Sequence, residues 1–210
     1  MNITVIGTGN MGASFVKQLT RAGHQVTITA RNLEKAKALA ANHAGAQALS
    51  VETAATKADA IIVATAYADA VPALTSLGDL RGKVVIDITN PLTADYMGLT
   101  LGHSTSAAEE IAKAVPEAKV VKAFNTVFAQ VLAEGADFGN GQRVPVYFAG
   151  DDTAAKTTVS SLIESIGFAP IDAGPLKNAR YLEPLAGLNI YFGYGAGKGT
   201  AIAPFWLDRV

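Results

Sequence analysis

The sequence predicts an α/β protein in which helices cover both faces of one doubly wound, mostly parallel β-sheet. Three observations lead to this fold class. Short apolar runs alternate with segments of helical periodicity through most of the 210 residues, which is typical of βαβ units. The first apolar run breaks directly into a glycine-rich turn that opens a helix. Small or polar residues follow several later runs, at the strand ends where open α/β sheets bind ligands.

The N-terminal stretch MNITVIGTGNMG carries the most informative motif. Its apolar residues predict a buried strand, and Met11, Phe15 and Leu19 then recur at helical spacing. Between them lies G-x-G-x-x-G, the dinucleotide fingerprint of Rossmann folds, in the strand-to-helix context that it requires. Gly7 allows the tight turn, Gly9 lets a pyrophosphate approach the backbone, and Gly12 lets helix and strand pack closely. The predicted phosphate-binding residues are Gly7, Thr8, Gly9, Asn10, Met11 and Gly12.

The end of the second predicted strand, Gln25–Thr29, bears on the choice of cofactor. NAD-binding folds place an acidic residue here to bind the ribose hydroxyls, but no Asp or Glu lies between Gly12 and Glu34. An arginine can instead pair with a ribose 2′-phosphate through charge-assisted hydrogen bonds; a solvated surface arginine is the alternative. We therefore predict NADP(H), bound by Thr29, Ala30, Arg31 and Asn32.

The middle of the chain continues the alternation. Helices are expected over Leu33–Asn42, Val51–Lys57 and Ala68–Leu77, and strands over Ala46–Ser50, Asp59–Ala64 and Lys83–Ile88. Thr65-Ala66-Tyr67 follows one of these strands and Thr89-Asn90-Pro91 another. Both tripeptides therefore lie at the carboxyl edge of the sheet, where a ligand is expected.

A polar loop over Leu92–Thr105 interrupts the pattern, and loops of this length are often functional or mobile. Ser104 or Ser106 is expected to cap the next helix, with Glu109 or Glu110 as its capping-box partner. A sixth strand, Ala118–Ala123, leads into Phe124-Asn125-Thr126 and a helix over Val127–Ala133. The expected strand order is 3-2-1-4-5-6.

The last third is predicted to be a strand and helix elaboration of the same domain. Strands are expected over Val144–Ala149, at or near an edge because of Pro145, and over Phe168–Asp172, with helices from Asp151 or Asp152 to Ile166 and over Asn178–Tyr191. No linker or repeat is visible. We predict one domain over residues 1–210, with a nucleotide-binding core to about residue 135 and the elaboration from about 136 onward.

Composition narrows the functional classes. A net charge of −1 gives no reason to expect nucleic acid or an anionic membrane as partner. The chain has no cysteine, so disulfides and thiolate chemistry are excluded. No leader and no apolar run of about 18 residues is visible, which favours a cytoplasmic protein. The three histidines share no metal-ligand spacing, so no metal site is predicted.

The sequence shows no acid–base pair suited to the oxidation of alcohols. Tyr194 and Lys198 have Y-x-x-x-K spacing, but the intervening Gly-Ala-Gly forms helix poorly, so we interpret the spacing as coincidence. Hydride transfer between two redox cofactors needs less from the protein, because the cofactors carry the chemistry.

Four segments together resemble the NADPH-dependent reductases of the deazaflavin coenzyme F420, a family with a nucleotide-binding domain like that of pyrroline-5-carboxylate reductase. They are GTGNMG, the Thr-Ala-Arg-Asn strand end, VVKAFNTVFAQ at Val120–Gln130 and GPLKNARYLEPLAGLN at Gly174–Asn189. The resemblance implies a deazaflavin beside the nicotinamide, and a match of Gly197-Lys198-Gly199-Thr200 to the family's late glycine segment. It also implies that Asn125 lies near the nicotinamide and that NADP is held by Gly7–Gly12, Thr29, Arg31, Asn32, Ala64, Thr65 and Asn90.

We therefore predict reversible hydride transfer between NADP(H) and coenzyme F420 or a flavin, in a cleft at the ends of the first, fourth, fifth and sixth strands. Its predicted polar lining is Thr65, Asn90, Asn125 and Thr126, with Asn125 as the positioning residue. Leu185, Leu188 and Asn189 are expected to form part of the acceptor's wall, and His103 to close over it. The alternatives are an NADP(H)-binding regulator without turnover and a ferric-reductase-like nucleotide module. The apolar tail Ala201–Trp206 favours a homodimer; a tail folded back on its own core is the alternative.

Overall fold

The computed structural model describes residues 1–139, 141–207 and 209. Its centre is an eight-stranded sheet in the order β3-β2-β1-β4-β5-β6-β7-β8. The predicted order of the first six strands is therefore confirmed. The strands are β1 (Asn2–Ile6), β2 (Gln25–Thr29), β3 (Ala46–Ala48), β4 (Ala60–Val63), β5 (Val84–Asp87), β6 (Lys119–Lys122), β7 (Pro145–Gly150) and β8 (Ala169–Asp172).

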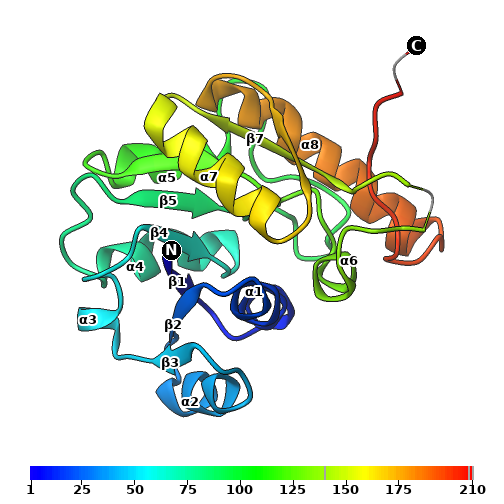
Figure 1. Ribbon diagram of the computed structural model, residues 1–210. Coiled ribbons are helices and arrows are strands. Elements are labelled where there is room, and N and C mark those ends of the chain that lie inside the picture. The colour runs from blue at the N-terminus through cyan, green and yellow to red at the C-terminus, as the bar shows by residue number, and fades with distance from the viewer. Residues whose placement is uncertain (140, 208, 210) are drawn as a thin grey trace.

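Helices lie on both faces of the sheet (Figure 1), as the doubly wound fold requires. They are α1 (Asn10–Arg21), α2 (Leu33–Ala41), α3 (Val51–Ala54), α4 (Tyr67–Thr75), α5 (Ala107–Ala114), α6 (Ala129–Glu134), α7 (Thr153–Ser165) and α8 (Ala179–Ile190). Two short turns flank α8, the 3₁₀ turn η1 (Leu176–Asn178) and the π-helical turn η2 (Tyr191–Gly195). Side chains cap three of the helices, and two of these caps, Ser106 and Asp152, are among the positions expected from sequence; the third is Asn32.

The strands β1 to β6 are mutually parallel. The central strands β1, β4, β5 and β6 are mostly buried, which is why they contain apolar runs, whereas the edge strand β3 is partly exposed. On one face α1, α2, α6 and α7 pack around Phe15, Phe124 and Phe168, whose rings meet edge to face. On the other face α3, α4, α5 and the start of α8 cover a second apolar cluster that includes Leu74 and Ile111.

Strand β7 runs antiparallel to β6, but only its C-terminal end is paired with it, through Gly150 and Ala149. Pro145 lies at the opposite end of β7, where no pairing with β6 requires its missing N–H. Edge strand β8 pairs with β7 in parallel over four residues. The expectation that the proline-bearing strand lies at or near an edge is met, because β7 is second from the edge.

Candidate functional site

The turn between β1 and α1 has room for a phosphate group only because three of its residues are glycines. Gly7 has a φ of +114° and its N–H donates to the Thr29 carbonyl at 2.9 Å. A Cβ at Gly7 would lie 2.4 Å from the Ala64 carbonyl oxygen, and one at Gly12 would lie 2.2 Å from that of Gly7. A Cβ at Gly9 would meet nothing within 4 Å. Gly7 thus lets the turn lie close to the end of β4, and Gly12 lets α1 lie close to the turn. Gly9, the N-cap of α1, faces open space.

A first cavity of about 760 Å³ opens from this turn between the ends of β1, β2 and β4. Most of the predicted cofactor residues line it, namely Gly7, Thr8, Gly9, Thr29, Ala30, Arg31, Asn32, Ala64, Thr65 and Ala66. The Arg31 guanidinium is largely exposed and lies 3.4 Å from the Asp69 carboxylate. Asn32 uses its side-chain oxygen to cap α2, accepting from the Lys35 N–H at 3.1 Å. Arg31 is therefore the cation available to a ligand phosphate here, with Lys35 beside it.

Sequence reasoning missed Lys35, Ser50 and Asp69 in this wall. Lys35 stands one helical turn beyond the cap Asn32, so its position could have been found once the start of α2 was predicted. Ser50 and Asp69 come from the segments after β3 and β4, and only the packing of the sheet brings them to Arg31.

A second cavity of about 590 Å³ lies on the other side of the glycine turn, starting at Asn10 and Met11. It is bordered by the ends of β5 and β6, the start of α6, the end of α8 and the tip of the 92–105 loop. Three of the four residues predicted to line one cleft do line this cavity, namely Asn90, Asn125 and Thr126. The fourth, Thr65, lines the first cavity instead. The predicted cleft is thus divided into two compartments, of which the first is lined by Gly9 and the second by the next residue, Asn10.

Two asparagines at neighbouring strand ends hold each other in place. Asn125 Nδ2 donates to Asn90 Oδ1 at 3.0 Å and to the Leu182 carbonyl at 2.8 Å, and Asn90 Nδ2 donates to the Asn125 carbonyl at 2.9 Å. Because both partners of Asn125 Nδ2 are acceptors, the orientation of its amide is determined. The preceding residue, Phe124, has a φ of +60°, a conformation that is costly for a bulky side chain and is typical of functional sites.

Four buried side-chain oxygens have no hydrogen-bond partner among the described residues, and three of them belong to residues lining these two cavities. They are Thr29 Oγ1 in the first cavity and Asn125 Oδ1 and Thr126 Oγ1 in the second; the fourth is Thr89 Oγ1. Unpaired buried polar atoms are rare in folded proteins and call for an explanation. A bound polar ligand that supplies partners is one such explanation.

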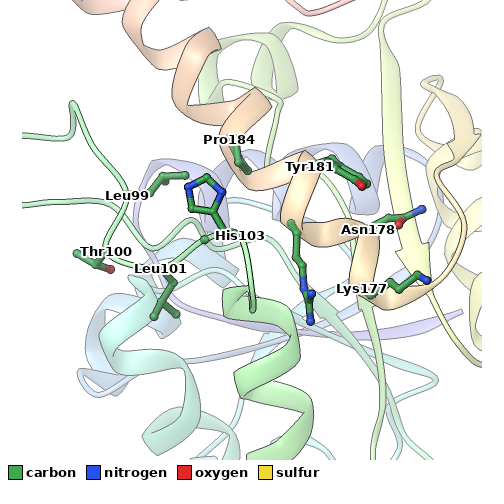
Figure 2. Close-up of a pocket in the computed structure, with 10 residues that line it drawn as sticks. Leu99, Thr100, Leu101, His103, Lys177, Asn178, Tyr181 and Pro184 are labelled. Carbon is green, nitrogen blue, oxygen red and sulfur yellow. The ribbon is translucent and has the colours of Figure 1, made fainter.

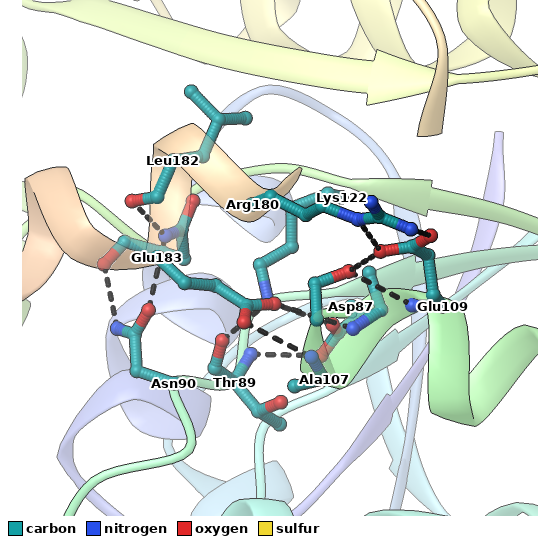
Figure 3. A network of polar contacts seen from close by, with 12 residues as sticks. Asp87, Thr89, Asn90, Ala107, Glu109, Lys122, Arg180, Leu182 and Glu183 are labelled. Atoms are coloured by element: carbon teal, nitrogen blue, oxygen red, sulfur yellow. Dashed lines mark hydrogen bonds and ion pairs between the residues drawn. The ribbon is translucent and has the colours of Figure 1, made fainter. Parts of the chain in front are cut away.

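A buried ionic network lies beside Asn90 (Figure 3). Lys122 Nζ donates to Asp87 Oδ2 at 2.8 Å, to Glu183 Oε1 at 2.7 Å and to the Thr89 carbonyl at 2.5 Å. All three ionic side chains are almost fully buried. The Glu183 carboxylate also accepts from the N–H groups of Ala107 and Ala108, so the positive end of α5 helps to balance the second carboxylate.

The titratable side chains in the described lining of the second cavity are those of Asp95, Tyr96 and Tyr194. Its one carboxylate, Asp95, accepts hydrogen bonds from the Thr93 hydroxyl and the Met97 N–H. These bonds, with that from Thr93 the larger cause, hold the pKa of Asp95 below its ordinary value. Asp95 therefore stays ionised at neutral pH and does not deliver a proton.

The Tyr194–Lys198 spacing does not form a tyrosine–lysine catalytic pair. Tyr194 lies in the π-helical turn η2, where its ring meets that of Phe128 edge to face at 5.9 Å. Lys198 lies beyond the turn, with Nζ 5.2 Å from the centre of the Phe192 ring. Thr200, from the late glycine segment, donates to Gln130 Oε1 at 2.5 Å; this segment lines neither cavity.

Three residues expected at the acceptor lie elsewhere. His103 lines a third cavity of about 930 Å³ together with Leu99, Lys177 and Tyr181, between the 92–105 loop and the first part of α8 (Figure 2). Leu185 packs against the cluster of Tyr147 and Leu182, and Leu188 is half exposed. The helical repeat explains the error, because α8 turns Ala186, Asn189 and Ile190 toward the second cavity instead. Asn189, the third residue expected in the acceptor's wall, does line the second cavity.

A dinucleotide phosphate fits these residues. The open face of Gly9, the N–H groups at the start of α1 and the exposed Arg31 are the donors that such a ligand needs. Within the described parts of the chain, no group of three or more His, Cys, Asp or Glu side chains could hold a metal ion. No helix in those parts has both the length and the apolar character required to cross a membrane.

Comparison with known proteins points to one family. Residues 2–91 match the family model described as NADP oxidoreductase, coenzyme F420-dependent. The F420-dependent NADP reductase of Methanothermobacter marburgensis is 32% identical over 207 residues, which cover 90% of this chain and 91% of that protein. A crystal structure assigned to the F420-dependent NADP reductases, from Arthrobacter sp. FB24, superposes with a TM-score of 0.82 and 31% identity, covering 95% of this chain and 96% of that one.

A second group of relatives consists of much longer proteins. The metalloreductase STEAP3 of Rattus norvegicus is 34% identical over 184 residues, which are 87% of this chain but 36% of that protein. The chain thus spans about a third of the length of these metalloreductases.

Proposed function

The chain belongs to the family of F420-dependent NADP oxidoreductases, and we propose that it transfers hydride reversibly between NADP(H) and a deazaflavin or flavin-like acceptor. The observation that carries this proposal is the second cavity. It adjoins the glycine turn, it is lined by amide and hydroxyl groups, and its described lining holds no histidine or lysine and a single carboxylate, Asp95. Such a site suits a reaction in which the two cofactors supply the chemistry and the protein positions them.

The first cavity would hold the adenosine half of NADP(H). The N–H groups at the start of α1 would bind the pyrophosphate, since Gly9 leaves its face of the turn open. Arg31 would exchange its exposed contact with Asp69 for the ribose 2′-phosphate. This exchange costs little, because an exposed ion pair contributes about 0–1 kcal/mol, whereas a hydrogen bond to a charged group contributes about 1.5–3 kcal/mol.

In the second cavity the protein would fix the orientation of the reacting rings. When bound, NADP(H) supplies or accepts the hydride. Asn125, held by Asn90 and Leu182, would present its unpaired oxygen to a donor on the bound ring. Phe124 and Phe128 would exclude water from the reacting atoms. Holding two reactants in near-attack geometry can contribute roughly 7–11 kcal/mol.

The test is a turnover assay with defined acceptors. The protein is mixed with NADPH and with coenzyme F420, FMN or FAD, and oxidation is followed at the nicotinamide absorbance band. We expect oxidation with at least one of these acceptors. Binding of NADPH without oxidation in every mixture would favour the regulator and reject the proposal.

Two variants locate the reaction. Asn125→Leu is expected to lower the single-turnover rate more than it weakens NADPH binding, because it removes the positioned amide. Lys198→Ala is expected to leave the chemical step nearly unchanged, since Lys198 lies over Phe192 and lines neither cavity. An unmodified rate in the Asn125 variant, together with a large loss in the Lys198 variant, would move the site elsewhere.

The metalloreductase relatives support a second candidate, in which the chain serves as a nucleotide module for electron transfer to ferric iron. Adding a ferric chelate to the same assay, with and without FAD, separates the two. Reduction of iron only when a flavin is present would make the flavin the direct acceptor, as proposed. For either reaction we further propose that the protein works in the cytoplasm.

A further inference from the structure

Large, exposed apolar side chains gather around the mouth of the second cavity. Tyr194 is 65% exposed, Tyr96 is 64% exposed and Met97 is 49% exposed, and all three line this cavity. Apolar and aromatic groups that remain exposed around a concave site commonly mark a place where a ligand binds. They come from two segments nearly 100 residues apart in the sequence, the 92–105 loop and the turn η2.

The π-helical turn is what places Tyr194 at the cavity. The helix α8 ends at Ile190 and widens into η2, and π turns of this kind occur frequently at functional sites. Gly193 allows the turn to lie close to Phe128, because a Cβ there would be 2.8 Å from the tip of the Phe128 ring. The Tyr194 ring is then supported edge to face by Phe128, and its outer surface is free.

The loop tip meets η2 across the cavity. Tyr96 has a φ of +62°, and the neighbouring Asp95 carboxylate accepts from the Met97 N–H at 3.1 Å. Met97 Sδ lies 3.6 Å from the position of a Cβ on Gly195. The two segments therefore form the rim of one opening, with a tyrosine on each side.

Resting on the function proposed above, we propose that Tyr194 is the aromatic face on which the acceptor ring stacks, and that it determines specificity for planar, fused rings. One face of the acceptor must contact the nicotinamide for hydride transfer, and the other face needs an apolar cover. Tyr194 supplies such a cover with few rotatable bonds. The only charged side chain in the described lining is the anion Asp95, so this cavity recognises the ring and not an anionic substituent.

The experiment measures ring binding without turnover. Oxidised lumiflavin, which consists of the fused ring without a phosphate chain, is titrated into protein saturated with NADP⁺, and quenching of its fluorescence gives Kd. Tyr194→Ala is expected to raise Kd roughly five- to tenfold, the scale of an aromatic pair, and Tyr194→Phe to stay within about twofold. Tyr181→Ala is the matched control, because Tyr181 is 74% exposed on α8 but lines the third cavity.

Three further measurements keep the result interpretable. Circular dichroism and the Kd for NADP⁺ should be unchanged in every variant, and light scattering should give the same mass, so that a change in assembly is not mistaken for a change in the site. Tyr194→Leu keeps the apolar volume without a planar face and should resemble Tyr194→Ala. Stacking would be overturned if Tyr194→Leu bound lumiflavin with the Kd of the unmodified protein. It would also be overturned if Tyr194→Ala and Tyr181→Ala had the same Kd for lumiflavin.

The outcomes also separate this inference from the proposed function. Lumiflavin binding that depends on Tyr194, in a protein that oxidises NADPH with no acceptor, would support the stacking face and reject the reaction. Oxidation of NADPH by a flavin, with no dependence of flavin binding on Tyr194, would support the reaction and reject the stacking face.

Discussion

Lys122 and Glu183 form a buried ion pair, with 2.7 Å between Nζ and Oε1, that joins β6 to α8 beside the candidate site. The residue before Glu183, Leu182, accepts the hydrogen bond from Asn125. The height at which α8 lies over the sheet, and hence the position of the Asn125 amide, therefore depends on this pair. Lys122 Nζ also lies 2.8 Å from Asp87 Oδ2, so a single ammonium group is paired with two carboxylates.

This arrangement predicts an order of destabilisation. Lys122→Met leaves two buried carboxylates without a cation and should lower the free energy of unfolding by about 3–5 kcal/mol. Glu183→Gln leaves the Lys122–Asp87 pair intact and should cost about 1–3 kcal/mol. Urea denaturation of both variants gives the comparison. A larger loss for Glu183→Gln would show that α5 and α8, rather than Lys122, hold the network together.

Arg31 should select NADPH over NADH. Removing it in Arg31→Ala is expected to raise the Kd for NADPH roughly ten- to a hundredfold, since a hydrogen bond to a charged group contributes about 1.5–3 kcal/mol, and to change the Kd for NADH by less than about twofold. Isothermal titration calorimetry measures both. Lys37→Ala is the control, because Lys37 pairs with Glu34 on the same helix and lines neither cavity. Equal Kd values for the two cofactors in the unmodified protein would contradict this assignment.

Substitutions at two glycines of the same turn should have different effects, one on dinucleotide binding and the other on fold stability. Gly9→Val should abolish dinucleotide binding with the fold intact, because its side chain projects into open space. Gly12→Ala should destabilise the fold by about 1–3 kcal/mol or more, because its Cβ would be driven into the Gly7 carbonyl. Thermal unfolding and a binding titration on each variant distinguish these effects. Normal binding by the Gly9 variant would mean that the turn serves packing alone.

The Glu109–Arg180 pair should make the start of α8 sensitive to acid. The Arg180 guanidinium, which donates to both Glu109 oxygens at 2.6 and 2.8 Å, holds the pKa of Glu109 below its ordinary value. A carboxyl group whose pKa is lower in the folded than in the unfolded state stabilises the fold at pH values above its unfolded pKa, which is about 4.3. This stabilisation is lost as the pH falls through the folded pKa. Arg180→Met should therefore cost about 1 kcal/mol at neutral pH and less near pH 3, as measured by urea denaturation. An equal cost at both pH values would contradict the pairing.

The C-terminal segment predicts a homodimer. Part of it folds onto the chain's own core, since Ile202 and Ala203 pack there and the Trp206 ring meets Tyr147 at 5.2 Å. Phe205 nevertheless remains 46% exposed and Leu207 83% exposed, as expected of an interface. Light scattering at micromolar concentration should give twice the chain mass, and a Phe205→Ser, Leu207→Ser variant should give the monomer. A monomeric mass for the unmodified protein would contradict the prediction.

Local patterns were sufficient to predict the sheet and the phosphate turn. The strand order follows from short crossovers between apolar runs, and the roles of Gly7 and Gly12 follow from the strand-to-helix context; the close contacts of both positions agree with them. Asn90 and Asn125 could be expected together because parallel strands end at one edge. The choice of cofactor, the division into domains and the individual roles of the site residues stay predictions.

What sequence could not show depends on contacts between distant segments. Lys122 lies in a strand whose pattern gives no sign of a buried cation, and its partner Glu183 is 61 residues away. Thr65 was grouped with Asn90, but the glycine turn separates their two compartments. The poor helix propensity of Gly-Ala-Gly argues only against a catalytic Tyr194–Lys198 pair. It gives no information on the π turn that brings Tyr194 to the second cavity, and this turn has no signature in the sequence.

Because Gly9 lines the first cavity and the next residue, Asn10, lines the second, NADP(H) would bind here as two linked fragments. A fragment such as 2′,5′-ADP should occupy the first compartment alone and leave the second free for a ring. Once the adenosine end is docked, the nicotinamide samples its own compartment at a high effective concentration. Substitutions in separate compartments, such as Arg31→Ala and Asn125→Leu, should then combine additively in their effects on the free energy of NADPH binding.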